Sequence, residues 1–157
     1  MTLPRTLDLP NLEAVVADVR QLHAQGYTCA GNWDLAQSCR HITQLLNICV
    51  DGTDFRAPLV LRIMAKLIGV KGRILRTRSI RAGLPAPDQF VFAPASDPAD
   101  EAQAVEDLAV AVQRVEQNRG RYHPHPIFGC ITDEQWLDFH AIHAAHHLRM
   151  LIPTPRG

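Results

Sequence analysis

Four stretches of the chain place hydrophobic residues three and four positions apart, which is the spacing of an amphipathic α-helix. They cover residues 11–25, 34–50, 98–118 and 132–151. A shorter helical segment is expected directly after Pro58, in LVLRIMAKLIG. No stretch shows the alternation of a convincing strand, so the pattern predicts an all-α protein.

The ends of the predicted helices carry recognisable start and stop residues. Asn32 is expected to cap the second helix, and Thr132 with Gln135 three residues later forms the capping-box pattern that opens the last one. Glycines end the first three helices, and Pro153 is expected to close the fourth.

Residues 69–98 are expected to form a long connection. Their first part, KGRILRTRSIR, is basic, and the second part, AGLPAPDQFVFAPASDP, is rich in proline. A connection of this length favours a four-helix bundle with a crossover over four helices joined only by short loops. The predicted fold is therefore an all-α four-helix bundle with one short extra helix.

Length and charge narrow the class of protein. The chain has 157 residues, so we expect a single domain over residues 1–157. Its sixteen basic and sixteen acidic residues cancel, and no global charge attracts it to nucleic acid or to a membrane. The N-terminus lacks the layout of a signal peptide, and four cysteines without a CxxC pair indicate reduced thiols. A cytoplasmic protein without a nucleic-acid or membrane partner is expected.

Half of the eight histidines lie in one short stretch of the last predicted helix, HAIHAAHHLRM. In helical projection Trp136, His140, His143 and His147 share an arc of about 60°, with His146 at its edge. His143 and His147 are four residues apart, so both rings can bind one metal ion. His140 and His147 are about 10 Å apart, which is too far to share an ion.

A third ligand is available on the second predicted helix. Catalytic zinc usually has three protein ligands and one open position, and His41 lies on the inward side of that helix together with Ser38 and Leu45. A lone histidine on an apolar face is more often a hydrogen-bonded core residue, and histidine pairs of this spacing also occur on solvated faces. The spacing alone leaves both interpretations open.

These residues also carry a family resemblance. NWDLAQSCRHITQLL resembles the second helix of the DinB/YfiT-like superfamily, in which a tryptophan opens the helix and a histidine follows about two turns later. HAAHH resembles the motif of that superfamily's last helix, whose first and last histidines are ligands. HPIFGCITDEQW followed by HAIHAAHHLR is similar to an uncharacterised branch of the superfamily. After the last histidine many relatives have Arg-Gly-Gln, whereas this chain has Leu148-Arg149-Met150.

The resemblance implies a fold and a site. The fold is an up-down-down-up four-helix bundle that forms a homodimer. The site is a divalent metal ion, zinc or nickel, held by His41, His143 and His147. The characterised relatives imply a metal-dependent enzyme that activates a thiol or water for transfer to, or hydrolysis of, a small molecule, with a low-molecular-weight thiol as one substrate. The alternative is a non-catalytic DinB-like dimeric bundle with a structural or absent metal.

Further candidates lie near this site. His125, Trp136, His140 and His146 are expected to line a pocket or to contact the ligands. For His125 and the neighbouring His123, a proline-braced turn with exposed rings is the preferred interpretation. The only basic cluster is interpreted as a solvated or dimer-contacting loop rather than a phosphate-binding surface, because no aromatic residues are interleaved with it. Its members are Lys71, Arg73, Arg76, Arg78 and Arg81.

Overall fold

The computed structural model describes residues 3–81 and 87–155, and these residues are mostly helical. They form six α-helices, one short 3-10 helix and one two-stranded sheet. The helices are α1 (Leu12–Gln25), α2 (Leu35–Asp51), α3 (Leu59–Leu67), α4 (Val70–Thr77), η1 (Asp88–Phe90), α5 (Pro98–Gln117) and α6 (Asp133–Leu148), and the strands are β1 (Tyr27–Cys29) and β2 (Leu151–Pro153). The all-α class predicted from the sequence therefore fits broadly.

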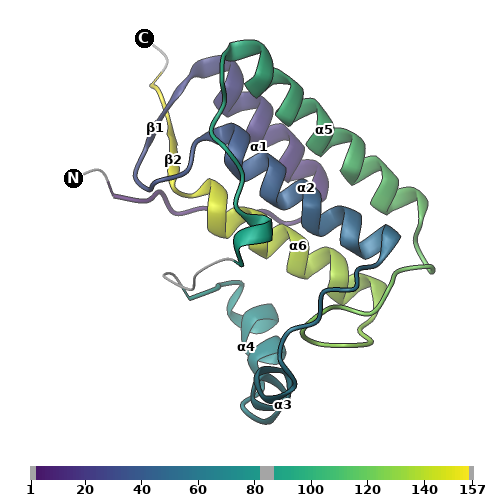
Figure 1. Ribbon diagram of the computed structural model, residues 1–157. Helices are drawn as coiled ribbons and strands as arrows, with labels where there is room; N and C mark the ends of the chain where they lie inside the picture. Colours follow the sequence, from purple (N-terminus) through teal and green to yellow (C-terminus); the bar gives the residue numbers. More distant parts are fainter. Residues whose placement is uncertain (1–2, 82–86, 156–157) are drawn as a thin grey trace.

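The four long helices α1, α2, α5 and α6 pack against one another around a hydrophobic core (Figure 1). Each contributes side chains that are almost fully buried, among them Val19, Ile42, Leu108 and Leu148. Helices α3 and α4 lie to one side of this group, where α4 packs against α6 and α3 packs against α4 (Figure 1).

Several predicted helix boundaries are confirmed. Thr132 accepts a hydrogen bond from the backbone of Gln135 and completes a capping box at the start of α6. Gly52, which ends α2, has a φ of 76°, a value that few residues other than glycine adopt. A Cβ atom at this position would lie 2.9 Å from Nδ1 of His123, so the close approach of the ring also requires glycine.

The predicted cap of α2 was wrong by two residues. Asp34, not Asn32, accepts the hydrogen bond from the backbone of Gln37. The side chain of Gln37 in turn accepts one from the backbone of Asp34. The pattern Asp-x-x-Gln is itself a capping box, so the signal was present in the sequence.

The predicted connection over residues 69–98 is partly helical. Its basic beginning forms α4, in which Val70 and Ile74 are half-buried and Arg73 and Arg76 are exposed. The interpretation of this segment as a loop was therefore wrong, because a helix of only eight residues shows too few turns for its apolar face to be recognised. Residues 82–86 of the predicted connection lie outside the described residues.

A small sheet joins the ends of α1 and α6, although no strand was predicted. β1 and β2 pair antiparallel, with Tyr27 opposite Pro153. Pro153 therefore belongs to a strand, and α6 ends earlier, at Leu148. Strands of three residues are too short to display an alternating pattern, and their pairing joins segments more than a hundred residues apart.

Candidate metal centre

His143 and His147 reach the site from the second half of α6. The two residues lie one turn apart, and Ala144, Ala145 and Leu148 between and beside them are buried in the core. Because the small and apolar residues anchor one side of the helix, the two imidazoles share the neighbouring side. Both rings are half-buried.

His41 reaches the same place from α2. Its ring is buried, with 4% of the residue exposed, and it lies among the buried residues Gln37, Ser38 and Ile42 of that helix. Nδ1 of His41 lies 2.8 Å from the carbonyl oxygen of Phe90. A carbonyl oxygen can only accept, so Nδ1 carries the proton and Nε2 keeps a free lone pair. A hydrogen bond of this kind is typical of histidines that bind metals through the other ring nitrogen.

The three Nε2 atoms converge. Nε2 of His143 lies 3.4 Å from Nε2 of His41 and 3.1 Å from Nε2 of His147. The possible ligand atoms of the three residues all lie within 4.8 Å of one another. Two nitrogen ligands of a tetrahedral zinc ion are about 3.3 Å apart, given zinc–nitrogen bonds of about 2.0–2.1 Å. The two nearest separations match that value, and the three histidines could hold a metal ion.

All three imidazoles are held in the neutral form that binds metals. Burial away from solvent lowers the pKa of His41. Burial also lowers the pKa of His147, to about 3, and the neighbouring rings of His41 and His146 contribute less. His143 has a pKa well below its ordinary value because it is desolvated and faces other imidazoles, first among them His147. Neutral rings offer their lone pairs without first releasing a proton.

Aromatic rings enclose the three histidines. Trp33, just before α2, stacks on His147 with ring centroids 5.1 Å apart and 8° between the planes, and meets His41 edge-on at 5.0 Å. Phe139 is parallel to the ring of His143, at 5.9 Å. The helix-opening tryptophan was part of the family resemblance, but no local pattern predicted that Trp33 and Phe139 contact the histidines.

The backbone of residues 90–95 is fixed to α2 beside His41. Gln37 donates from Nε2 to the carbonyl oxygen of Phe92 at 2.8 Å, and Arg40 donates to the carbonyl oxygen of Ala93 at 2.9 Å. The carboxylate of Asp34 accepts from the backbone of Ala95 at 2.8 Å. These three contacts attach to α2 the backbone that follows Phe90, whose carbonyl oxygen is the acceptor for His41.

Trp136, His125 and His140 lie together in a second aromatic cluster rather than at the three-histidine site. Trp136 stacks on His140 with centroids 4.9 Å apart, and His125 lies 4.7 Å from Trp136. The interpretation of His125 as an exposed ring was wrong, because the residue is buried and only 5% of it is exposed. His123 is exposed, as expected. The backbone amides of Ile127 and Phe128 donate to Nδ1 of His125, at 3.0 and 3.2 Å, and this turn folds the ring inward.

His140 is the member of that cluster whose burial is least compensated by hydrogen bonds. It is 1% exposed, and neither ring nitrogen has a hydrogen-bond partner among the described residues. Burial lowers its pKa to about 3, with a smaller contribution from His125. Of the four additional candidates, His146 has a ring contact with the three-histidine group, edge-on to His147 at 5.2 Å, and His140 is close enough to contribute to the lowered pKa of His143.

The cysteines do not enter the site. All four lie in the described part of the chain and are free thiols, Cys39 and Cys49 buried and Cys29 and Cys130 exposed. Burial raises the pKa of the Cys49 thiol to about 12, so this side chain is inert at neutral pH.

The fold and the site together define a mostly helical protein with three convergent, neutral histidines that could bind a divalent ion. The chain belongs to the DUF1569 family, described as a protein of unknown function, whose family model matches residues 1–154. No curated protein and no solved structure matched the chain.

Proposed function

We propose that this protein is a divalent-metal-dependent enzyme of the DinB-like type, with His41, His143 and His147 as the metal ligands. The observation that carries the proposal is the convergence of three Nε2 atoms from two helices, with Nδ1 of His41 already engaged by the carbonyl of Phe90. Three nitrogen ligands suit zinc or nickel and leave a position for a further ligand.

The chemistry of the site follows from its charge. Three neutral imidazoles leave the +2 charge of the ion uncompensated, and no described carboxylate forms a hydrogen bond or an ion pair with them. A divalent ion in such surroundings lowers the pKa of a bound water or thiol and so supplies a nucleophile near neutral pH. Transfer of a small thiol to an electrophile, or hydrolysis of a small molecule, is the reaction class that fits.

The residues of the chain have separate tasks in this proposal. Phe90 sets the tautomer of His41 through its carbonyl oxygen. Trp33 covers one face of His147 and limits the approach of solvent from that side. His143 and His147 are half-buried residues, whereas His41 is buried, so we expect a small substrate to approach the ion from their side.

A non-catalytic bundle with a structural metal is the second candidate, favoured by one observation. The site joins α2 to α6 and includes the buried His41, so a bound ion would cross-link two core helices. Binding to the native state alone raises stability, and the gain grows with metal concentration. The homodimer implied by the resemblance stays a prediction.

Elemental mass spectrometry of tag-free protein tests the metal site. About one zinc or nickel ion per chain is expected in the wild type, and none in His41→Ala and His143→Ala. His123→Ala is the matched control, because His123 is an exposed histidine outside the site. A wild-type protein that takes up neither ion after incubation with it removes the proposal.

A screen of thiol-transfer and hydrolysis substrates then separates the two candidates. Turnover that is lost in His143→Ala and kept in His123→Ala supports an enzyme. Metal binding that raises the melting temperature, together with no turnover of any substrate, supports the structural role.

A further inference from the structure

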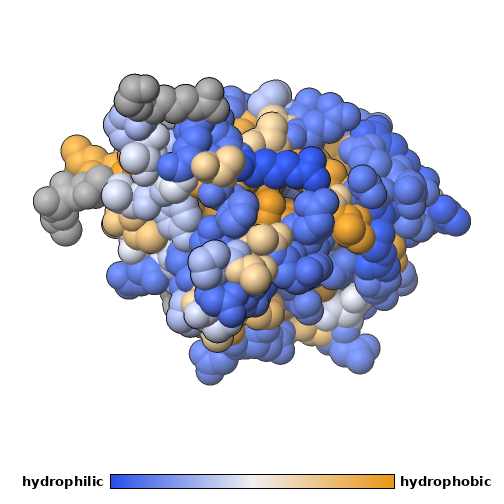
Figure 2. Space-filling view, turned by 90° about the horizontal axis from the view of Figure 1, so that it is seen from above, coloured by the Kyte–Doolittle hydropathy of each residue, from blue (hydrophilic) through white to orange (hydrophobic). Residues whose placement is uncertain are grey.

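Helix α3 exposes an unusual amount of hydrophobic surface. Six large apolar residues of α3, and Ile68 directly after it, are between 48% and 75% exposed. They are Leu59, Val60, Leu61, Ile63, Met64, Leu67 and Ile68. In the rest of the described chain only Leu3, Val91 and Val110 are large hydrophobic residues exposed to this degree. The end of the molecule opposite α3 is mainly hydrophilic on the face seen in Figure 2.

The apolar residues of α3 form one continuous face. At about 100° per residue they span roughly 200° of the helix circumference, from Leu59 to Leu61. Ala65 lies outside this arc and is buried, with 7% exposed, so it marks the side that faces the protein. The free face is therefore wider than the stripe that a surface helix normally buries.

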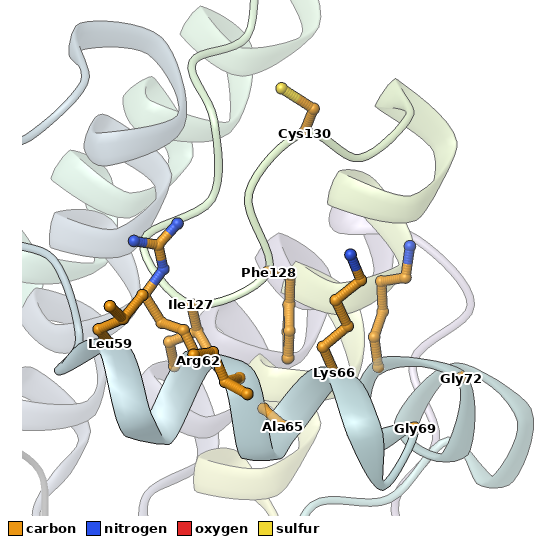
Figure 3. A pocket seen from close by; sticks show the side chains of 11 residues that line it. Leu59, Arg62, Ala65, Lys66, Gly69, Gly72, Ile127, Phe128 and Cys130 are labelled. Atoms are coloured by element: carbon orange, nitrogen blue, oxygen red, sulfur yellow. The ribbon is translucent and has the colours of Figure 1, made fainter.

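The charged residues of α3 lie beside this face and not within it. Arg62 and Lys66 line a cleft of about 530 Å³ between α3, α4 and the segment of Ile127 and Phe128. Figure 3 shows both side chains extending from the same side of α3, toward that segment. Long cationic side chains at the border of an apolar face can place their charges at the level of lipid headgroups.

Basic residues are concentrated in the segment of the chain that contains α3 and α4. Eight of the sixteen basic residues lie between positions 55 and 87, and this stretch contains no acidic residue. The other residues of the chain hold eight basic and sixteen acidic side chains, so the net charge of zero hides two regions of opposite sign. Arg78 is paired with Asp8 and Asp138, whereas Arg73 and Arg76 are exposed on α4.

We propose that the α3–α4 hairpin, Leu59–Thr77, docks on the surface of an anionic phospholipid bilayer. The apolar face of α3 enters the boundary between headgroups and acyl chains, and the surrounding cations contact lipid phosphates. Among the described residues, no helix has both the length and the apolar character to cross a bilayer. The nine residues of α3 span only about 14 Å, so the helix lies in the plane of the surface.

Charge disfavours a symmetric dimer through α3 as the occupant of this face. Two α3 faces in a symmetric dimer would bring two hairpins together, each with cations and no acid, and like charges repel. An acidic protein partner would match the charge, but it would have to surround more than half of the circumference of α3. A fluid anionic lipid surface supplies the negative charge and can surround the apolar face of α3 without a preformed groove.

Co-sedimentation with vesicles tests the proposal on the intact protein. Vesicles of phosphatidylcholine with about one third phosphatidylglycerol are expected to bind at least roughly tenfold more protein than pure phosphatidylcholine, and salt should weaken the binding. Leu67→Glu and the double variant Arg73→Glu/Arg76→Glu should each lose most of this binding. Val110→Glu on α5 and the double variant Arg119→Glu/Arg121→Glu are matched exposed controls that should bind as wild type.

Two results would overturn the proposal. One is that folded wild-type protein binds equally to both kinds of vesicle, or binds to neither. The other comes from sedimentation velocity without lipid. A dimer that dissociates in Leu67→Glu but persists in Val110→Glu would show that a second copy of the chain covers α3.

Discussion

The carbonyl oxygen of Phe90 lies 2.8 Å from Nδ1 of His41 and fixes which nitrogen of that ring is free to bind a metal. The two residues are 49 positions apart in the sequence. Phe90 ends the short η1 helix, and the following backbone is attached to α2 by Gln37 and Arg40. The orientation of one imidazole thus depends on the placement of a segment without long regular structure.

Replacing Gln37 tests this dependence. Gln37→Glu keeps the side-chain acceptor of the capping box but removes the donor to the carbonyl oxygen of Phe92. We expect metal affinity to fall by roughly 10–100-fold, as it does when groups that orient metal ligands are lost, while the helical circular dichroism is retained. Competition titration with a chromophoric chelator measures the affinity.

The control for this variant is the same substitution in the other capping box. Gln135→Glu keeps the acceptor for the backbone of Thr132 at the start of α6, away from the three histidines. Its metal affinity should equal that of wild type. Equal affinities in both variants would show that the attachment through Gln37 does not orient His41.

Trp33 should report metal binding by its fluorescence. The chain has two tryptophans, and only Trp33 has ring contacts with the three histidines, at 5.1 Å from His147 and 5.0 Å from His41. Addition of nickel should quench the emission of the wild type and of Trp136→Phe, and it should leave that of Trp33→Phe nearly unchanged. Quenching that disappears in Trp136→Phe instead would place the ion in the other aromatic cluster.

The buried histidines should make the protein less stable in acid. The pKa values of His125 and His140 are lowered by burial to about 4 and about 3, from 6.5. At a pH between the lowered pKa of each ring and 6.5, the unfolded state binds a proton that the folded state does not. The free energy of unfolding therefore falls as the pH decreases below about 6.5. Each group contributes a slope of at most about 1.4 kcal/mol per pH unit.

Urea unfolding in the presence of a chelator, from about pH 4 to pH 7, measures this slope. His140→Phe keeps a ring stacked on Trp136 and removes two ring nitrogens without partners among the described residues. Its slope should be lower than that of wild type by up to about 1.4 kcal/mol per pH unit. An unchanged slope would mean that His140 is protonated at the same pH in both states.

Arg78 should hold the hairpin to the remainder of the protein. Its guanidinium donates to Asp138 on α6 at 2.8 Å, to Asp8 at 2.7 Å and to the backbone carbonyl of Leu9 at 2.7 Å. Because the group is partly exposed, we expect Arg78→Ala to cost about 1 kcal/mol of global stability. The larger effect should be faster hydrogen exchange in α4, measured by mass spectrometry.

Arg119→Ala serves as the comparison for Arg78. Arg119 pairs with Glu116 three residues away on an exposed surface, so its loss should change stability by no more than about 0.5 kcal/mol and should not affect exchange in α4. Equal exchange in α4 for the two variants would show that Arg78 does not hold the hairpin, which leaves the Lys71–Gln135 hydrogen bond and the half-buried apolar residues of α4 to do so.

The sequence by itself determined the features that depend on neighbouring positions. Helical spacing predicted the four long helices, and the Thr132–Gln135 pair marked the start of α6, because caps and amphipathic faces are set within a few residues. The same local geometry put His143 and His147 on one side of their helix. The family resemblance then named His41 as their companion.

Only the tertiary structure decided the features that join distant segments. The carbonyl that orients His41, the stacking of Trp33 on His147, the burial of His125 and the pairing of β1 with β2 all involve residues brought together by packing. The α4 helix and the exposed face of α3 belong here as well, since the contacts of a short helix decide which of its sides is buried. Sequence periodicity describes one element at a time, whereas burial and hydrogen-bond partners depend on how the elements are assembled.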